Sequence, residues 1–511
     1  MNPAAGMRPG LRACLPAWLA AWILPVLSTL AAAPTLEHLY PFTAALGSTQ
    51  TVTLAGKFDP WPPRFWTQGS GITWTAETNA GKARLEIATD ATPGPRLVRL
   101  FNDEGASDPR FLLITAQPDL AEVEPNNRAN AAQRLETLPA RVIGRFEKSG
   151  DVDSFTFEVP AGQWLEARVE SYVLMSKLDA VLRLLDPQGR QITWNHDSDT
   201  LDPRLLWKAE QASTVVLQVF GFRYPADSSV QLSGGDGAIY RLLVDTTNQA
   251  PVLIPPNSAV PAVTDASTND ASLAIDPPRV LAGTLDAAGK EDRHPFVVNG
   301  GEYIEASVEA VALGSPLDAT LRILDRASAE LVHVDDSEGS PDPRLVWKAP
   351  TNGIYFANVR SLTRRAGPDH RYRLTLRRLA AGARVTLPAG TLATQPGTTN
   401  AIKFRISRQA GHTNAVQVRF QDLPPGLSAE SVTAPAGDGE GSLSLVVSTN
   451  AAAFSGPLTI QAVDATQEIP GLAAFELTSR GENNGVPQGY SRLWINQIDH
   501  FWLAIRPPKE K

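Results

Sequence analysis

Cysteine is almost absent from this sequence of 511 residues, because Cys14 is the only one. That absence excludes a disulfide framework, a cysteine-based zinc site and an iron–sulfur cluster. Positive charge is also scarce, since 46 lysines and arginines face 54 acids and the net charge is −8. Such a chain lacks the basic footprint of a nucleic-acid-binding protein, so we expect no nucleic-acid partner. It also lacks a polybasic segment that would hold it on an anionic membrane.

The patterns of the common catalytic sites are missing as well. The seven histidines are scattered, and there is no G-x-S-x-G turn, no H-E-x-x-H pair, no glycine-rich phosphate loop and no dinucleotide fingerprint. Paired carboxylates for glycoside chemistry are an exception, because the fold sets their spacing. We therefore predict a protein that is not an enzyme. A hydrolase with an unfamiliar site, in residues 381–511 for example, is the alternative.

The first 33 residues have the organisation of a secretory signal. Arg8 and Arg12 form a short basic region, an apolar run follows over residues 15–30, and three alanines end the segment. The run has about 16 residues, whereas about 20 are needed to span a bilayer. We therefore predict a signal peptide over residues 1–33, with a retained anchor as the alternative. No later stretch is apolar enough for a membrane span, so we expect a periplasmic, cell-surface or extracellular protein.

Most periodic segments alternate between apolar and polar residues. Residues 155–159, 165–170, 371–377 and 402–407 all show this period of two, which is typical of strands with one buried face and one solvated face. The 38 glycines and 41 prolines interrupt these segments at short intervals. This pattern favours antiparallel β-sandwiches over helical or parallel-sheet folds. The sequence predicts an all-β protein with one short helix, over residues 128–138.

A long internal duplication is the most informative feature. Residues 178–186 (LDAVLRLLD) and 317–325 (LDATLRILD) are identical at seven of nine positions, at an offset of 139. Residues 202–209 (DPRLLWKA) and 342–349 (DPRLVWKA) are identical at seven of eight positions, at an offset of 140. A repeat of this length is a whole domain and not a solenoid unit.

The duplication divides the chain into tandem domains. We predict two repeat units, over residues 119–247 and 271–380, joined by a linker over 248–270 that is rich in proline, serine, threonine and asparagine. Short strands separated by turns on both sides predict an immunoglobulin-like β-sandwich over 34–118 and another over 381–511.

The repeat units resemble a known family, the bacterial pre-peptidase C-terminal (PPC) domain. The segments of the first unit that show the resemblance are Glu122-Val123-Glu124-Pro125-Asn126-Asn127, Gly150-Asp151-Val152-Asp153-Ser154-Phe155 and Asn195-His196-Asp197-Ser198. The second unit lacks the E-x-E-P-N segment, and the two units cover about half of the chain. The resemblance implies a jelly-roll-like β-sandwich of about eight strands. It also implies a non-catalytic domain of exported proteins, some of which bind calcium and some of which bind collagen or other insoluble polymers.

Calcium is the sharpest hypothesis for a site. The cation prefers oxygen ligands from carboxylates, amides and carbonyls, and four such side chains stand within six residues of the first unit. The resemblance implies that two aspartates from a hairpin complete the cage. The predicted ligands are Glu122, Glu124, Asn126, Asn127, Asp151 and Asp153. The alternative is a solvated acidic segment with a turn at Pro125.

Two other groups of residues have less specific patterns. A second acidic cluster contains Asp197 and Asp199 in the first unit and Asp335, Asp336 and Glu338 in the second; we favour local turn chemistry there, in which carboxylates accept backbone N–H groups.

Aromatic residues form the other group. Trp207 and Trp347 follow the duplicated D-P-R-L segment, and we expect them in the core. Trp61, Phe65 and Trp66 crowd a proline-rich stretch where we expect loops. They are candidates for contacting a sugar ring or a partner protein, with core packing as the alternative.

The sequence as a whole predicts an exported, non-catalytic, multidomain binding or adhesion protein with PPC-like domains that calcium stabilises. The expected partner is a polysaccharide, a protein or another cell-envelope ligand. A structural spacer and an accessory subunit of a separately encoded secreted enzyme are the alternatives.

Overall fold

The computed structural model describes most of the chain. The described residues are 32–198, 200–225, 231–235, 237–248, 262–264, 267–313, 315–337, 340–464, 470–477 and 492–506. The predicted signal peptide up to residue 31, most of the predicted linker, Asp199 and Glu338 lie outside them.

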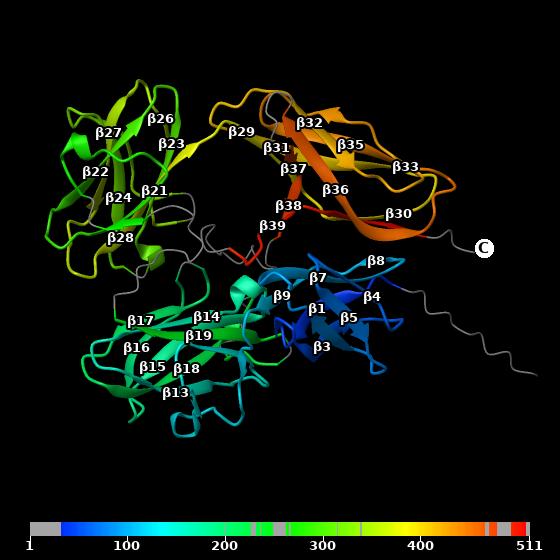
Figure 1. Ribbon diagram of the computed structural model, residues 1–511, viewed down its shortest axis with the longest axis horizontal. Helices are drawn as coiled ribbons and strands as arrows, with labels where there is room; N and C mark the ends of the chain where they lie inside the picture. The colour runs from blue at the N-terminus through cyan, green and yellow to red at the C-terminus, as the bar shows by residue number, and fades with distance from the viewer. Residues whose placement is uncertain are drawn as a thin grey trace, which may run out of the picture.

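The described residues form an all-β protein of tandem β-sandwiches, as the alternating sequence pattern predicts. Their strands assemble into eight sheets, and each predicted domain contributes two of them. Figure 1 shows the four sandwiches arranged two by two. The helices in this part of the chain are single 3-10 turns, and none is long and apolar enough to cross a membrane.

The N-terminal sandwich packs a sheet of order β1-β3-β6-β5 against one of order β2-β9-β7-β4, with β8 paired to β7. Its strands are β1 (Thr35–Tyr40), β2 (Thr43–Ala45), β3 (Thr49–Lys57), β4 (Arg64–Thr67), β5 (Ile72–Ala76), β6 (Lys82–Ile87), β7 (Gly94–Asn102), β8 (Gly105–Ala106) and β9 (Arg110–Thr115). Alternation is clear in β6, where Ala83, Leu85 and Ile87 are buried.

The first repeat unit, called copy one below, has sheets of order β10-β12-β19-β14-β17 and β11-β13-β18-β15-β16. Its elements are β10 (Leu120–Ala121), η1 (Ala129–Ala131), β11 (Gln133–Arg134), β12 (Ala140–Arg145), β13 (Asp153–Val159), β14 (Trp164–Glu170), η2 (Tyr172–Leu174), β15 (Leu178–Leu185), β16 (Gln191–Asn195), β17 (Arg204–Lys208), β18 (Ser213–Arg223) and β19 (Ile239–Thr247). The predicted helix over 128–138 is wrong. Only η1 is helical there, because the residues of β11, in the middle of the segment, are extended and pair with β13.

The second repeat unit, copy two, repeats this arrangement with sheets of order β20-β21-β28-β23-β26 and β22-β27-β24-β25. Its elements are β20 (Ala262–Thr264), η3 (Ala271–Leu273), β21 (Arg279–Thr284), β22 (Glu291–Val298), β23 (Tyr303–Glu309), η4 (Val311–Leu313), β24 (Ala319–Leu324), β25 (Glu330–Val334), β26 (Arg344–Lys348), β27 (Gly353–Ser361) and β28 (Arg371–Leu379). Strand β20 lies inside the predicted linker but pairs in parallel with β21.

The C-terminal sandwich has sheets of order β33-β35-β31-β29-β38-β39 and β30-β40-β36-β32-β34, with β37 paired to β36. Its strands are β29 (Gly382–Leu387), β30 (Thr391–Thr394), β31 (Thr399–Gln409), β32 (Val416–Gln421), β33 (Leu427–Ser428), β34 (Val432–Thr433), β35 (Gly439–Val447), β36 (Phe454–Asp464), β37 (Pro470–Leu472), β38 (Ala474–Glu476), β39 (Gln497–Ile498) and β40 (Phe501–Ile505).

The duplicated D-P-R-L segment has a structural role in both copies. Asp202 is buried and accepts hydrogen bonds from the backbone N–H groups of Ser171, Tyr172 and Val173, so it holds the turn that contains η2. Asp342 accepts from two backbone N–H groups at the same place in copy two. Trp207 and Trp347 pack, partly buried, against the cores of their copies. This segment therefore repeats because it fixes the fold.

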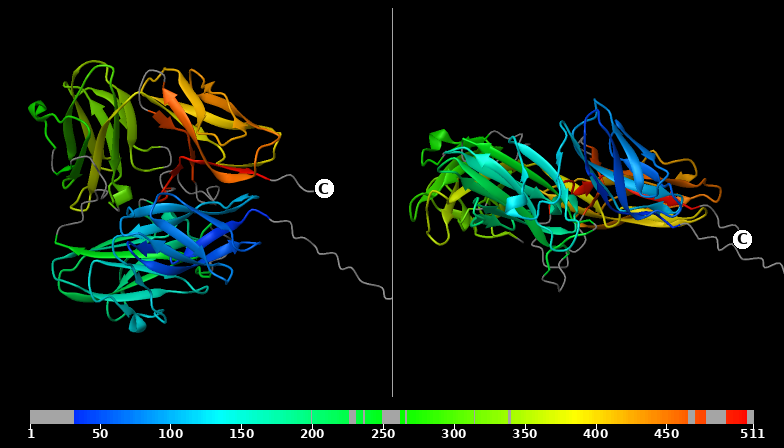
Figure 2. Two further views of the ribbon diagram at one scale, coloured as in Figure 1. Left: turned by 45° about the vertical axis from the view of Figure 1, so that its right-hand side comes forward. Right: turned by 90° about the horizontal axis from the view of Figure 1, so that it is seen from below.

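Each sandwich contacts the next. Lys177 of copy one pairs with Glu37 of the N-terminal sandwich at 2.7 Å, and the Arg371 guanidinium of copy two lies 5.3 Å from the ring centroid of Trp164 in copy one. The last sandwich also contacts the first, since Trp502 on β40 is buried against Trp66. Figure 2 shows this closed arrangement from two further sides. The four sandwiches thus form one block, not an extended string.

Candidate metal centre

Three carboxylates of copy one converge where the chain enters the sandwich. Glu124 follows β10, Asp151 lies in the turn between β12 and β13, and Asp153 is the first residue of β13. One oxygen from each lies within 4.8 Å of the other two. Asp151 and Asp153 are buried, although aspartate is almost never fully buried unless it is paired. The fold therefore gathers three carboxyl groups in a site where two of them are buried.

Three buried oxygens in this cluster have no hydrogen-bond donor among the described residues. They are Oε1 of Glu124, Oδ1 of Asp153 and Oδ1 of Asn126. Asn126 is 0% exposed. A buried acceptor without a donor costs about 1 to 3 kcal/mol, and more when it is charged. Orphaned oxygens of this kind, gathered beside a third carboxylate, fit a hard cation that takes six to eight oxygen ligands.

The other oxygens of the cluster are held in place by the protein. Oε2 of Glu124 accepts from the backbone N–H of Asn126 at 2.9 Å, and Oδ2 of Asp151 accepts from the backbone N–H of Glu147 at 2.8 Å. The Asn127 amide donates to the second oxygen of Asp151. Each of these two carboxylates is therefore oriented through an oxygen that has a protein donor.

A tyrosine closes the inner side of the cluster. The Tyr240 hydroxyl donates to Oδ2 of Asp153 at 2.6 Å and lies 3.0 Å from Oε2 of Glu122. Its ring covers Gly144, where an added Cβ would lie 2.3 Å from the ring carbon Cζ. Only glycine fits under this ring, so Gly144, Tyr240 and Asp153 form a single packed unit.

Without a bound cation, ionising the acidic cluster is unfavourable. Burial raises the pKa of Glu122, and burial together with the charge of Glu122 raises the pKa of Asp153. Burial and the same two carboxylates also raise the pKa of Tyr240. All three shifts oppose negative charge at this place. A bound divalent cation would offset that charge and supply the partner that the orphaned oxygens lack.

The six predicted ligands thus divide into two groups. Glu124, Asp151 and Asp153 converge. The backbone of Asn126 bonds to Glu124 on one side and to Ser154 of the hairpin on the other, and its side-chain amide is buried without a partner. Glu122 and Asn127 have supporting contacts, because Oε1 of Glu122 accepts from the backbone N–H of Arg145 at 2.7 Å and Asn127 donates to Asp151. Sequence reasoning missed Tyr240. The signal was its recurrence as Tyr372 at the end of the second unit.

Copy two has a lysine where copy one has one of these carboxylates. Lys290 occupies the position of Asp151, and its ammonium lies 3.6 Å from Oδ1 of Asp292, the equivalent of Asp153. The ammonium also lies 3.0 Å from Asp286 and donates to the backbone oxygen of Thr284. Tyr372 donates to the other oxygen of Asp292 at 2.7 Å, as Tyr240 does in copy one. Copy two therefore carries its own positive charge beside the buried aspartate.

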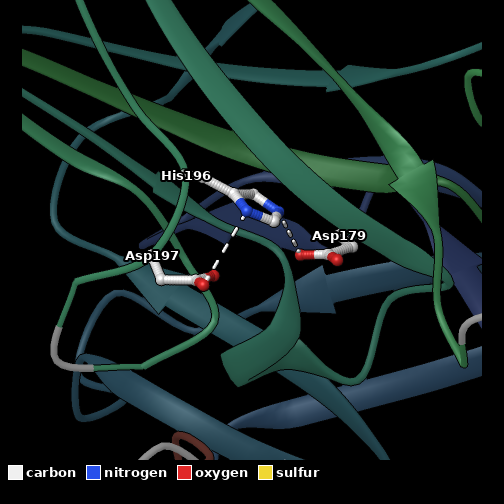
Figure 3. Close-up of side chains that lie close together, drawn as sticks. All are labelled: Asp179, His196 and Asp197. Atoms are coloured by element: carbon white, nitrogen blue, oxygen red, sulfur yellow. Dashed lines mark hydrogen bonds and ion pairs between the residues drawn. The ribbon is translucent and has the colours of Figure 1, made fainter.

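A second group with metal-binding residue types surrounds His196. Figure 3 shows its ring between two carboxylates, with Nε2 at 3.0 Å from Asp179 and Nδ1 at 3.7 Å from Asp197. The hydrogen bond with Asp179 raises the pKa of His196. In copy two the histidine is replaced by Asp335, whose carboxylate accepts from the backbone N–H of Asp336. When it is protonated, the histidine offsets one of the two carboxylate charges, so an ion pair accounts for this group.

The three candidate aromatic residues take part in packing. Phe65 and Trp66 lie on strand β4, where we expected loops, because β4 pairs with β7. Phe65 stacks on Trp74 with ring centroids 5.3 Å apart, and the ring of Trp66 lies 4.4 Å from that of His500 in the C-terminal sandwich. Trp61 donates its indole N–H to the backbone oxygen of Glu77. All three rings are partly buried.

Comparisons with known proteins identify no family. No protein-family model and no curated protein matches the chain. Among solved structures, the chain is similar to domains 1–6 of surface layer protein SbsC, with 9% identity, a TM-score of 0.16, and coverage of 87% of this chain and 54% of that one. It is also similar to the N-terminal eight Ig domains of Down Syndrome Cell Adhesion Molecule, with 11% identity, a TM-score of 0.17, and coverage of 86% and 54%. The chain spans about half the length of these two structures, and no function follows from TM-scores of this size.

Proposed function

We propose that this protein is an exported, non-catalytic β-sandwich protein that binds a ligand of the cell envelope or the exterior, and that one calcium ion stabilises its first PPC-like unit. The single observation that supports the proposal most strongly is the set of buried, orphaned oxygens on Glu124, Asn126 and Asp153 beside Asp151. The PPC resemblance of the same segments supports a role in binding.

The proposed ligands of the ion are Glu124, Asn126, Asp151 and Asp153. Calcium in this place would supply positive charge and would join the entry segment after β10 to the turn before β13. The protein orients these ligands. Tyr240 donates to Oδ2 of Asp153, whose Oδ1 has no donor, and the backbone N–H of Glu147 and the Asn127 amide hold Asp151 through its two oxygens. The role we assign to the ion is structural.

The metal part of the proposal is tested by melting the full chain with calcium and with a chelator. At a calcium concentration about tenfold above the dissociation constant, linkage adds about 1.4 kcal/mol to the free energy of unfolding. We expect the melting transition of copy one to rise by several degrees with calcium. A matched control is Asp292→Asn in copy two, which changes stability without changing the calcium response. Identical melting curves with calcium and with chelator would contradict the proposal.

The binding part is tested separately by co-sedimentation of the full chain with isolated cell envelope, insoluble polysaccharides and collagen. We expect retention on at least one of these, and loss of the chain from the pellet when the soluble form of the same polymer is added in excess. Retention on none of them would favour the alternative of a structural spacer.

A further inference from the structure

A hollow of about 760 Å³ lies on one sheet of the C-terminal sandwich. Strands β29, β31 and β35, which are neighbours in that sheet (Figure 1), supply its lining. The lining residues are Arg384, Thr386, Leu387, Pro388, Lys403, Phe404, Arg405, Ser407 and Glu440. The volume falls within the range of ligand pockets, which is about 300 to 1,000 Å³.

Positive charge gathers in this hollow although the chain is acidic overall. Strand alternation places Lys403, Arg405 and Ser407 on the exposed face of β31, while Phe404 and Ile406 point into the core. The two cationic residues on β31 are therefore about 7 Å apart along the strand. Arg384 lies opposite Ser407 on β29, which adds a third cation to the same face.

The charges on β31 have little internal compensation. Within the described part of the chain, the side chains of Lys403 and Arg405 form no ion pair or hydrogen bond. The single acid in the hollow, Glu440, lies opposite Arg405 on β35 without an ion-pair contact to it. By contrast, Arg241 in copy one is held by Asp119 and Glu170 at 2.8 and 3.2 Å. Lys403 and Arg405 thus present cationic groups whose hydrogen-bonding capacity is available to a ligand.

We propose that this hollow binds an acidic oligosaccharide through its carboxylate or sulfate groups, an inference that rests on the proposed binding function and names its site. Guanidinium groups recognise carboxylate and sulfate oxygens in a planar, two-bond geometry. The hydroxyls of Thr386 and Ser407 and the carboxylate of Glu440 match the hydroxyl groups of a sugar, and Pro388 offers an apolar surface to a sugar ring.

A nucleic acid is the less favoured anion for this site. Nucleic-acid binding depends on neutralising many phosphates over a wide basic surface. Here three cations stand beside Glu440 in a protein of net charge −8. A short run of anionic sugars needs only the local charge of the hollow, so the acidic oligosaccharide is the occupant that the surface fits best.

The inference is tested by calorimetric titration of the full chain with tri-galacturonate, with neutral maltotriose and with a single-stranded DNA of similar charge. We expect binding of tri-galacturonate only, weakening with added salt. The double variant Lys403→Gln/Arg405→Gln should weaken that binding at least tenfold. Arg419→Gln is the matched control, because Arg419 lies on the other sheet of the same sandwich and bonds to Gln461; it should bind as the unmodified chain does.

The melting temperature of each variant shows whether it is folded, and Lys403→Glu provides a second, single change that should abolish binding by charge reversal. No binding of tri-galacturonate, equal binding by the double variant, or equally tight binding of DNA would each overturn the inference. If the double variant still sediments with cell envelope, the proposed binding function holds but the hollow is not the binding site. If the unmodified chain sediments with nothing, the proposed function itself fails.

Discussion

Copy one and copy two share a fold and a buried aspartate but differ in what stands beside it. In both, a tyrosine from the last strand donates to the aspartate, Asp153 or Asp292. In copy one the neighbour is Asp151, and in copy two it is Lys290. A buried carboxylate needs positive charge nearby or it is costly. The residue at this one position therefore decides where the positive charge beside the aspartate comes from. In copy two it is the ammonium of Lys290, and in copy one, in our proposal, it is a bound cation.

The largest effect should come from the feature that the copies share. Gly144→Ala and Gly283→Ala each place a Cβ 2.3 Å from the tyrosine above it, at Cζ of Tyr240 and at the hydroxyl of Tyr372. Because neither ring can move without breaking its bond to the aspartate, we expect a loss of about 3 kcal/mol in each case. Denaturant unfolding of the two variants measures it. A loss of stability in only one of the two variants would show that the contact between glycine, tyrosine and aspartate differs between the copies.

The next largest effect should appear in copy two alone. Lys290→Met removes the ammonium beside Asp292, which is 2% exposed. Since the lysine itself is partly exposed, we expect a loss of about 1 to 2 kcal/mol rather than the full cost of breaking a buried pair. The calcium response of the chain should not change, and a melting experiment at two calcium concentrations checks both points. A calcium response that disappears with Lys290 would break the distinction between the copies.

A third variant gives copy one the lysine that copy two has at the equivalent position. Asp151→Lys places an ammonium beside Asp153, so the calcium-dependent stability of about 1.4 kcal/mol at tenfold saturation should vanish. In chelator the variant should melt no lower than the unmodified chain. Asp151→Asn is the control, because it removes the ligand without supplying the charge and should melt lower than Asp151→Lys. The account is wrong if the lysine variant keeps its calcium response.

The smallest effect concerns the histidine that copy two lacks. The hydrogen bond with Asp179 raises the pKa of His196 in the folded chain above its unfolded value near 6.5. Its contribution is therefore fully present below pH 6.5 and is lost as the pH rises through the folded-state pKa. Because the side chain is one-third exposed, with 33% of its surface accessible, the effect should stay below about 1 kcal/mol.

His196→Gln should flatten this part of the stability profile of copy one. Unfolding by urea at pH 5.5 and pH 8 measures the difference between the variant and the unmodified chain. A larger difference at pH 8 than at pH 5.5 would reverse the predicted sign and contradict the assignment of the ion pair to Asp179.

The sequence predicted the sandwich fold because the strand pattern is local. Segments such as 155–159 and 402–407 lie in strands β13 and β31, and the repeat identified two equivalent units. The acidic cluster was predictable in part, because Glu124 and the two hairpin aspartates stand in the segments that show the family resemblance. The predicted helix over 128–138 was wrong, because so short a helix is not stable without packing and residues 133–134 pair with β13 instead.

What the sequence could not show is contact between distant segments. The role of Tyr240 depends on its register opposite Gly144, and that of Lys290 on its distance from Asp292. Likewise Trp66 meets Trp502 only because the last sandwich packs on the first. Register and domain packing are set by the summed burial of many residues, so single segments do not reveal them.

The central claim is most directly tested by titrating the chelator-treated full chain with calcium in a calorimeter. The account predicts one site per chain, abolished by Asp153→Asn and unchanged by Asp292→Asn. Absence of any binding heat together with unchanged melting, or two equivalent sites of which Asp292→Asn removes one, would contradict it.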